Sequence, residues 1–393
     1  MRRLFLIFTI LSCFLVSGQT RISGIVKDKI TREPLAGASV FVPNTTNGGA
    51  TDENGFFSFT LRENQLELLI SYIGYESVMV PTASFAATDK NNVLYLSPSV
   101  NTIKEVVVTK MDPKERKRHL ETFKREFIGL GEIALKTKIL NPEVLQFETR
   151  KEHSSLVVTA YEPVILVNEK TGYEISYELV YFESRTVPED SNQKLTTYIG
   201  YPFFKDITVQ KKLNPEKIAK ARAQCYQGSS MHFIRSLYNN TCDKEGFRMQ
   251  KFTRLLNNNY PTAEQIQRMK YDAIMSGTPF RYPQKYTTTF DNNPCSVNDL
   301  VFEKEGKKHL YFPDCLSVVY TKEGEESNYS EFTHAKHPKE QFSRLELLKN
   351  QPIEIYANGN YANPEELGNF GYMGWKKMGE MLPFDYQPEA ISN

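Results

Sequence analysis

The first hundred residues contain short runs of alternating apolar and polar residues, separated by Gly, Pro, Asp and Asn. These runs lie near 20–27, 37–43, 55–61, 66–72, 75–81 and 92–97. Because successive side chains of a strand point to opposite faces, each run suits a strand with one buried face. Gly55 can take the positive φ that a hairpin turn at 52–55 requires. The pattern therefore predicts a small antiparallel β-sandwich over residues 19–98.

The apolar positions of these runs define the expected core of the sandwich. We expect most of it to consist of Ile22, Val26, Val40, Val42, Phe57, Phe59, Leu68, Ile70, Val78, Val80 and Leu94. Such aliphatic and aromatic side chains bury apolar surface and bring no catalytic group. Structural requirements therefore explain this segment almost entirely.

The same segment resembles the carboxypeptidase regulatory-like domain, a transthyretin-type sandwich. The motifs that carry the resemblance are Glu33-Pro-Leu-Ala-Gly37, Thr51-Asp-Glu-Asn-Gly55 and Ser71-Tyr-Ile-Gly-Tyr75. Similar domains precede the plug of SusC-like TonB-dependent outer-membrane receptors, and Lys104-Glu-Val-Val-Val-Thr109 resembles the segment that follows them. The resemblance implies the fold of the N-terminal domain and a linker strand over 99–111. What it implies about function is limited to the cell envelope.

The N-terminal sequence indicates an export signal. A charged start, an apolar run and small residues before Gln19 predict a signal peptide at 1–18. A lipoprotein is the alternative, because Ile10-Leu-Ser-Cys13 loosely fits a lipid-attachment box. No later segment approaches the roughly 20 uninterrupted apolar residues of a membrane-spanning helix. We therefore expect an exported chain of the periplasm or the outer membrane, without a transmembrane span in its mature form.

Charge balance narrows the class of partner. The chain has 48 basic and 47 acidic residues, so no global field attracts nucleic acid or anionic lipid. Aromatic residues make up 12% of the chain and are frequent between 356 and 386. Their flat faces can stack on sugar rings, or they can form core. We expect the partner to be another envelope protein or a glycan, and no nucleic acid.

Four cysteines remain outside the expected signal peptide: Cys225, Cys242, Cys295 and Cys315. An oxidising compartment favours their pairing, and three connectivities are possible. Pairing Cys225 with Cys242 and Cys295 with Cys315 is favoured, since each bond closes a short loop. The spacings lack the C-x-x-C pairs of a zinc site, which makes metal binding the weaker interpretation.

The remaining chain predicts a mixed antiparallel-sheet and helix domain over 112–388, so the fold class is α+β. Leu120, Phe123 and Phe127 recur at helical spacing after Pro113, which indicates a helix over 112–127. Expected strands lie at 144–147, 156–160, 164–167, 173–179 and 196–199, with further short strands over 280–358. Expected helices lie near 215–227, 229–240 and 260–275 and within 361–384, before a loose tail.

Ser229, His232 and Arg235 form the best polar constellation of this second domain. Their spacing places neighbouring side chains on one face of a helix that opens after Gly228. One interpretation is a ligand site in which His232 and Arg235 hold a carboxylate, phosphate or uronic acid. In the other, Ser229 caps the helix, His232 is a satisfied buried group and Arg235 pairs with an acid. We expect no catalytic residues, because nothing marks an oxyanion hole or a third orienting acid.

A zinc peptidase is poorly supported. His337-Pro-Lys-Glu340 matches the H-x-x-E spacing of two metal ligands, but no histidine follows His337 to provide the third. We expect no metal and no cofactor. The leading hypothesis is a non-catalytic, exported envelope protein with a binding or scaffolding role. The alternatives are a hydrolase that acts on peptide or glycan through the second domain, and an outer-membrane transport accessory related to TonB-dependent receptors.

Overall fold

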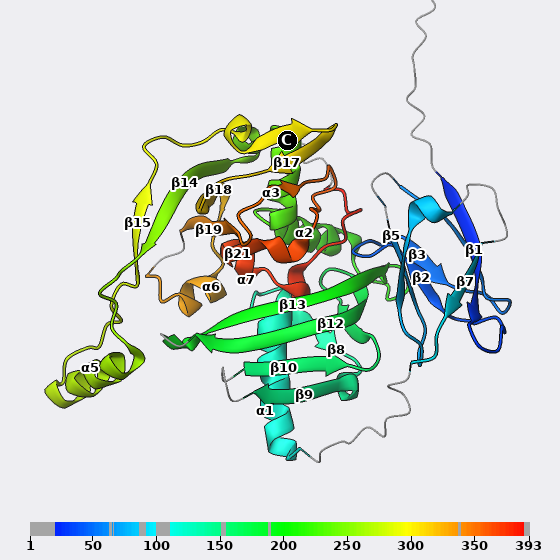
Figure 1. Cartoon of the computed structure of the whole chain (residues 1–393), viewed down its shortest axis with the longest axis horizontal. Coiled ribbons are helices and arrows are strands. Elements are labelled where there is room, and N and C mark those ends of the chain that lie inside the picture. Colours follow the sequence, from blue (N-terminus) through cyan, green and yellow to red (C-terminus); the bar gives the residue numbers. More distant parts are fainter. Residues whose placement is uncertain are drawn as a thin grey trace, which may run out of the picture. The chain divides into compact units, whose positions relative to one another are not determined.

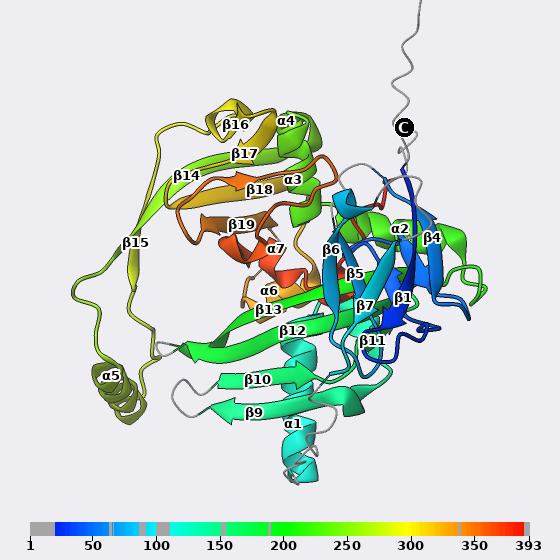
Figure 2. The same cartoon turned by 45° about the vertical axis from the view of Figure 1, so that its right-hand side comes forward.

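The protein is described by a computed structural model over residues 20–62, 65, 67–85, 92–99, 111–150, 155–187, 190–336 and 339–388. Contacts divide the chain into two units. Unit 1 comprises residues up to Val42 and Asn47–Ser99, and unit 2 comprises Pro43–Thr46 and the chain from residue 100 onward. The expected signal peptide, Cys13 and the segment at 104–109 lie outside the described residues. Figures 1 and 2 show the elements of each unit.

Unit 1 is a β-sandwich of two sheets, which confirms the predicted sandwich, although its first and last strands pair in parallel rather than antiparallel. The first sheet has the order β4-β1-β7, with β1 (Arg21–Asp28) between β4 (Phe56–Thr60) and β7 (Val93–Leu96). The second has the order β3-β2-β5-β6, with β2 (Ser39–Phe41), β3 (Gly48–Ala50), β5 (Glu67–Ser71) and β6 (Val78–Pro81), followed by the 3-10 turn η1 (Thr82–Ser84). All six expected strands are present. The sequence missed only β3, whose Gly-Gly-Ala sequence has no strand preference.

The core of unit 1 lies between its two sheets. Ile22 and Val26 of β1 are fully buried, and so are Leu68 and Ile70 of β5. All eleven core residues expected from the sequence lie in this cluster or pack against it. Gly55 has a φ of 70°, and its N–H donates to Asp52 O at 2.9 Å. The alternating pattern and the turn glycine therefore account for the sandwich.

Unit 2 contains an antiparallel six-stranded sheet. Its strands are β8 (Lys138–Ile139), β9 (Leu145–Arg150), β10 (Ser155–Ala160), β11 (Val164–Asn168), β12 (Tyr173–Val187) and β13 (Asp190–Asp206). The order is β8-β11-β12-β10-β9, and β13 pairs along the other edge of β12. Strands were expected at each of these places except β8, but the length of the β12–β13 hairpin was not foreseen.

Helix α1 (Pro113–Phe123) continues directly into a π-helical turn, η3 (Lys124–Ile128), and packs against this sheet. Phe123 and Phe127 are completely buried. The Phe123 ring lies 4.9 Å from that of Phe182 on β12, and the Phe127 ring lies 4.9 Å from that of Tyr177 on the same strand. The apolar stripe expected on this helix therefore forms the core of the sheet and helix layer.

A second antiparallel sheet has the order β15-β14-β18-β19-β21. Its strands are β14 (Phe247–Leu256), β15 (Tyr286–Phe290), β18 (Cys315–Gly324), β19 (Glu340–Leu347) and β21 (Leu367–Gly371); a small sheet joins β16 (Val301–Lys304), β17 (Lys307–Leu310) and β20 (Ile353–Glu354). Helix α3 (Ser230–Tyr238) packs into the second core through Phe233, Ile234 and Leu237. Figures 1 and 2 show that β14 and β15 extend outward to an arm that ends in α5 (Ala263–Ser276).

The helices of unit 2 after α1 range from 4 residues in α4 to 14 residues in α5. They are α2 (Pro215–Tyr226), α3 (Ser230–Tyr238), α4 (Cys242–Glu245), α5 (Ala263–Ser276), α6 (Ser327–Phe332) and α7 (Tyr372–Trp375), with 3-10 turns η4 (Ala134–Lys136), η5 (Pro142–Val144), η6 (Val297–Asp299), η7 (Pro364–Glu366) and η8 (Met378–Glu380). The helices expected near 215–227, 229–240 and 260–275 are confirmed. None of the helices within the described ranges has the length and apolarity needed to span a membrane.

The helical stretch expected within 361–384 is present only as single helical turns. The structure has β21, α7 and two 3-10 turns there. Pro364 removes a backbone donor, and glycines recur at 368, 371, 374 and 379. Glycine and proline each disfavour a helix interior, which limits the helical structure of this segment to single turns.

Neither expected disulfide is present, because all four cysteines are free thiols. Cys225 belongs to the core beneath the six-stranded sheet, whereas Cys242 belongs to the second core. Helix α3 lies between them in the chain, so a short loop did not bring them together. Burial raises the pKa of the Cys242 thiol to about 12 and that of Cys315 to about 11.

Gly200 tests how tightly the long hairpin packs. A Cβ at Gly200 would collide with the Tyr177 ring and with the carbonyl oxygen of Glu178. We expect Gly200→Ala to destabilise unit 2 by about 1–3 kcal/mol through overpacking. The measurement is urea unfolding followed by the fluorescence of Trp375, the single tryptophan of the chain. Gly324→Ala is the control, since its Cβ would meet nothing closer than 3.6 Å; equal losses in both variants would contradict the packing.

Candidate ligand-binding site

Ser229 caps helix α3. Its hydroxyl accepts a hydrogen bond from the N–H of His232 at 3.2 Å. An N-terminal helical N–H group has no partner within the helix, and a serine at this position provides one. The capping role that the sequence analysis considered is therefore realised.

His232 is buried among aromatic rings. Its ring lies 4.6 Å from that of Tyr226 and 4.8 Å from that of Phe247. Nδ1 accepts from the N–H of Gly228 at 3.2 Å, so the proton of the neutral ring is on Nε2, which lies 3.3 Å from Glu245 Oε2. Burial lowers the pKa of His232 to about 4, although Glu245 opposes that shift. The imidazole is therefore neutral at pH 7, and both of its nitrogens are occupied.

Arg235 is also buried, and it binds backbone rather than an acid. Its Nε donates to Asn358 O at 2.9 Å, and one terminal nitrogen donates to the carbonyls of Phe384 and Tyr386. The guanidinium lies 5.4 Å from the centre of the Tyr226 ring. Arg235 thus joins α3 to the C-terminal segment of unit 2. The structure brings the three predicted residues together around the start of α3, and their binding of a ligand stays a prediction.

The H-x-x-E motif is only partly described, because His337 lies outside the described residues. Glu340 begins β19 and forms an ion pair with Arg248. Within the described ranges, no three His, Cys, Asp or Glu side chains are grouped in a way that could hold a metal ion.

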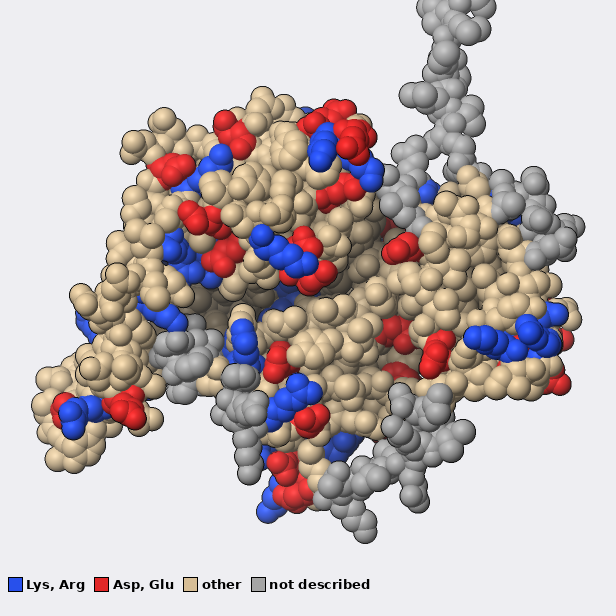
Figure 3. Space-filling model, in the orientation of Figure 1, with Lys and Arg blue, Asp and Glu red and all other residues tan. Residues whose placement is uncertain are grey.

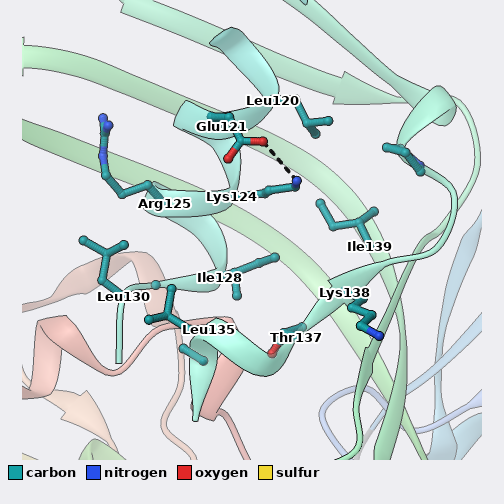
Figure 4. Close-up of a pocket in the computed structure, with 13 residues that line it drawn as sticks. Leu120, Glu121, Lys124, Arg125, Ile128, Leu130, Leu135, Thr137, Lys138 and Ile139 are labelled. Atoms are coloured by element: carbon teal, nitrogen blue, oxygen red, sulfur yellow. Dashed lines mark hydrogen bonds and ion pairs between the residues drawn. The ribbon is translucent and has the colours of Figure 1, made fainter. Parts of the chain in front are cut away.

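A pocket that the sequence analysis did not foresee lies beside the π-helical turn (Figure 4). Its volume is about 460 Å³. The residues that line it are Leu120, Glu121, Lys124, Arg125, Ile128, Gly129, Leu130, Ala134, Leu135, Thr137, Lys138, Ile139 and Pro142. One wall is thus the end of α1 with η3, and the other is the segment from η4 through β8.

The pocket has aliphatic walls and charged side chains among them. Figure 4 shows Leu120, Ile128 and Ile139 directed toward the space between the two walls. Lys124 pairs with Glu121 at 3.1 Å, and Lys138 comes from the facing segment. Apolar walls with a few convergent polar groups are the usual composition of a small-molecule site.

The wall formed by η3 is held in place from its other side. Gly129 ends the turn with a φ of 103° and donates to Lys124 O, which is the i→i+5 bond of a π-helix. Glu126 points inward, where its carboxylate lies 2.8 Å from Arg125 Nε and 3.0 Å from Lys377 Nζ. Burial alone would raise the pKa of Glu126, but Lys377 and Arg125 outweigh it and lower the pKa. π-Helical turns are frequent at functional sites.

Glu380 is a second buried carboxylate that the sequence analysis missed. It is 5% exposed, and its Oε2 has no hydrogen-bond partner among the described residues. A Cβ at Gly131 would collide with both Glu380 Oε2 and Glu326 Oε1, so the two carboxylates are neighbours. Burial, aided by Glu326, raises the pKa of Glu380 to about 7. The available sequence signal was a lone acid within the apolar run from Met378 to Leu382.

On the face shown in Figure 3, cationic and anionic side chains are interspersed. No large area of a single sign is visible on that side. This distribution agrees with the near balance of 48 basic and 47 acidic residues. Recognition on this face therefore depends on local groups.

Comparisons with known proteins bear on unit 1. Residues 22–108 match the CarboxypepD_reg-like domain family, which confirms the resemblance. A TonB-dependent receptor of Formosa agariphila is 36% identical over 109 residues, which are 26% of this chain and 10% of the receptor. The TonB-dependent receptor SusC of Bacteroides thetaiotaomicron is 37% identical over 90 residues, which are 23% of this chain and 8% of the receptor.

Unit 1 is therefore a carboxypeptidase regulatory-like domain, and its relationship to TonB-dependent receptors supports an envelope-associated role. The match spans only a tenth or less of each receptor. A solved protein of unknown function from Bacteroides fragilis aligns over 90% of this chain and 95% of its own. Its 10% identity and TM-score of 0.16 support no inference.

The opposite environments of the Glu126 and Glu380 carboxylates can be tested with one pair of variants. The pKa of Glu126 is lowered from 4.5, so its ionised form stabilises the fold above that pH and the stabilisation is lost as pH falls further. We expect Glu126→Gln to be less stable than the wild type at pH 7 by about 1–3 kcal/mol, with the difference shrinking below pH 4.5.

Glu380→Gln should behave in the opposite way. Its raised pKa means that stability falls as pH rises from 4.5 to about 7 and stays constant above that. We expect this variant to be more stable than the wild type at pH 8, with the gain vanishing near pH 4.5. Urea unfolding across this pH range measures both. The same pH trend in the two variants would contradict the opposite environments.

Proposed function

We propose that this protein is an exported, non-catalytic binding protein of the cell envelope, in which unit 2 holds the ligand. The observation that carries the proposal is the pocket between η3 and β8, with its aliphatic walls and cationic side chains. A ligand with an apolar body and one carboxylate or phosphate group fits that composition.

The charges support an anionic ligand. Lys124, Arg125 and Lys138 line the pocket, whereas Glu121 is the one acidic residue among the lining side chains. Lys124 pairs with Glu121 and Arg125 with Glu126, and Figure 4 shows Lys138 directed away from the space between the walls, so an incoming anion would be attracted by the net positive charge of the lining residues together. A partly desolvated anion gains more from a cation than it would in water.

The composition of the walls argues for an aliphatic ligand over a sugar. None of the residues that line the pocket is aromatic, and stacking on sugar rings requires aromatic faces. Of the aromatic residues between 356 and 386, Tyr372 and Trp375 are buried, and Tyr361 and Phe384 pack against core clusters. A glycan or a second envelope protein would therefore bind elsewhere on the chain.

The hydrolase alternative has one observation in its favour. Glu380 is a buried carboxylate with a raised pKa, Glu326 is its neighbour, and two close carboxylates can serve as an acid and base pair. However, Glu326 accepts from the Trp375 indole and from the N–H of Glu132, and neither carboxylate lines the pocket in Figure 4. Binding is therefore the function we propose.

The binding role is tested with 1-anilinonaphthalene-8-sulfonate, an apolar anion that fluoresces in apolar sites. We expect saturable binding to the full mature chain, and binding at least about tenfold weaker in Leu135→Asp, which adds a charge to the pocket wall. Leu140→Asp is the matched control, because Leu140 is 56% exposed and Leu135 55%, but only Leu135 lines the pocket. Equal binding by both variants would overturn this site.

The envelope role is tested by cell fractionation of the C-terminally tagged protein in a bacterium of the Bacteroidetes type. We expect the tag in the periplasmic or outer-membrane fraction, and in the cytoplasm after deletion of residues 1–18. A full-length protein that stays in the cytoplasm would contradict export. The same fractions, extracted with detergent, report whether the wild type is membrane-attached.

A further inference from the structure

Strand β15 is an open edge of the second sheet of unit 2. Among the strands that the structure describes, it pairs with β14 alone, and all five of its residues are exposed. Figures 1 and 2 show it on the outer side of β14. Its sequence, Tyr286-Thr-Thr-Thr-Phe290, contains no charge and no proline. Natural proteins usually protect edge strands with such residues, because an open edge readily pairs with another strand.

The backbone groups at this open edge belong to Tyr286, Thr288 and Phe290. Asp291 N–H donates to Lys251 O, and Asn257 N–H donates to Lys285 O, so residues 285 and 291 direct their backbone groups toward β14. Direction alternates along an antiparallel strand. The N–H and C=O groups of the even-numbered residues 286, 288 and 290 therefore point away from β14.

The sequence around this edge is complementary to itself when read in the opposite direction. In an antiparallel pairing centred on Thr288, Tyr286 faces Phe290 and Thr287 faces Thr289 of the other strand. One residue farther out, Lys285 faces Asp291, which places opposite charges together at both ends. Aromatic pairs, threonine pairs and opposite charges are the cross-strand pairs that stabilise antiparallel sheets.

We propose that two copies of this chain associate by antiparallel pairing of β15 with β15 about a twofold axis at Thr288. Tyr286, Thr288 and Phe290, whose backbone groups point away from β14, then exchange hydrogen bonds with the second copy. The register that aligns complementary side chains therefore also aligns the backbone donors and acceptors. The contact is isologous, as a closed symmetric dimer requires. It joins the two five-stranded sheets into one continuous sheet.

Side chains on β14 contact the two aromatic residues on one face of this edge. The Phe252 ring lies 5.0 Å from that of Phe290, and the Arg254 guanidinium lies 4.0 Å from the centre of the Tyr286 ring. Both aromatic side chains are thus held on the face where each would meet its counterpart in the second copy. A two-stranded ribbon is marginal by itself, and a third strand stabilises it.

The interface is short, so the dimer should be weak and dependent on concentration. Sedimentation velocity of the full mature chain, over a series that reaches roughly 200 μM, measures it. We expect the wild type to dimerise within this range and Thr288→Pro to stay monomeric. Proline removes an outward N–H and is tolerated on an edge strand, so the monomer should keep its fold and its circular dichroism. Thr288→Ser is the control and should dimerise like the wild type.

A charge exchange tests the register. Asp291→Lys places two cations opposite each other at each end and should raise the dimer dissociation constant roughly tenfold. The double variant Lys285→Asp/Asp291→Lys restores opposite charges and should recover dimerisation. A wild type that is monomeric throughout the series would overturn the proposal and leave the edge to a different partner. Dimerisation of Thr288→Pro, or of Asp291→Lys without loss, would overturn it as well.

Discussion

Burial of Phe123 and Phe127 against β12 is the interaction on which the rest of unit 2 depends. The Phe127 ring is also 5.2 Å from the Tyr198 ring of β13, so one side chain contacts both strands of the long hairpin. Three consecutive residues, Glu126 to Ile128, are buried in the turn that follows α1. Consecutive residues of a regular helix diverge around its axis, so the π-helical turn coincides with an unusually wide buried face. The outer side of that turn forms the pocket wall.

The pKa of Glu126 is lowered and that of Glu380 is raised, because the cations near the two side chains differ in which groups they bind. Glu126 lies beside Lys377 and Arg125, and its carboxylate is stabilised in the ionised form. Lys376 acts to lower the pKa of Glu380, but its Nζ already donates to the carbonyls of Gln224, Cys225 and Gln227. Lys376 therefore offsets only part of the cost of burying Glu380. One glutamate anchors the pocket wall, and the other lowers stability at neutral pH.

Sequence patterns predicted the elements whose causes are local. The alternation in unit 1 placed six strands and the core, and the stripe on α1 identified Phe123 and Phe127 as buried. Where a cause lies far along the chain, the patterns failed. The extension of β12 and β13 depends on pairing between residues such as Thr186 and Lys194 at its far end, and the pKa of Glu380 is raised by its burial and, to a smaller extent, by Glu326.

The candidate site shows the same division. Ser229, His232 and Arg235 were found because helical spacing is visible in sequence, yet their partners include Glu245 and the carbonyls of residues 384 and 386, which spacing does not reveal. The pocket escaped prediction because its walls come from two segments joined by an irregular turn. Aliphatic residues such as Leu135 and Ile139 carry no chemical signature of a binding site. A self-complementary edge, in contrast, is visible in sequence once its exposure is known.

Native-state hydrogen exchange, read by mass spectrometry over residues 124–129 of the full chain, tests the central claim most directly. If aromatic burial and the inward ion pairs fix the pocket wall, the amide of Gly129 should exchange as slowly as the amides of the core strand β12. Both would then exchange only through global unfolding of unit 2. Exchange of Gly129 as fast as that of an exposed loop, with β12 still protected, would show that the wall is not held in this way.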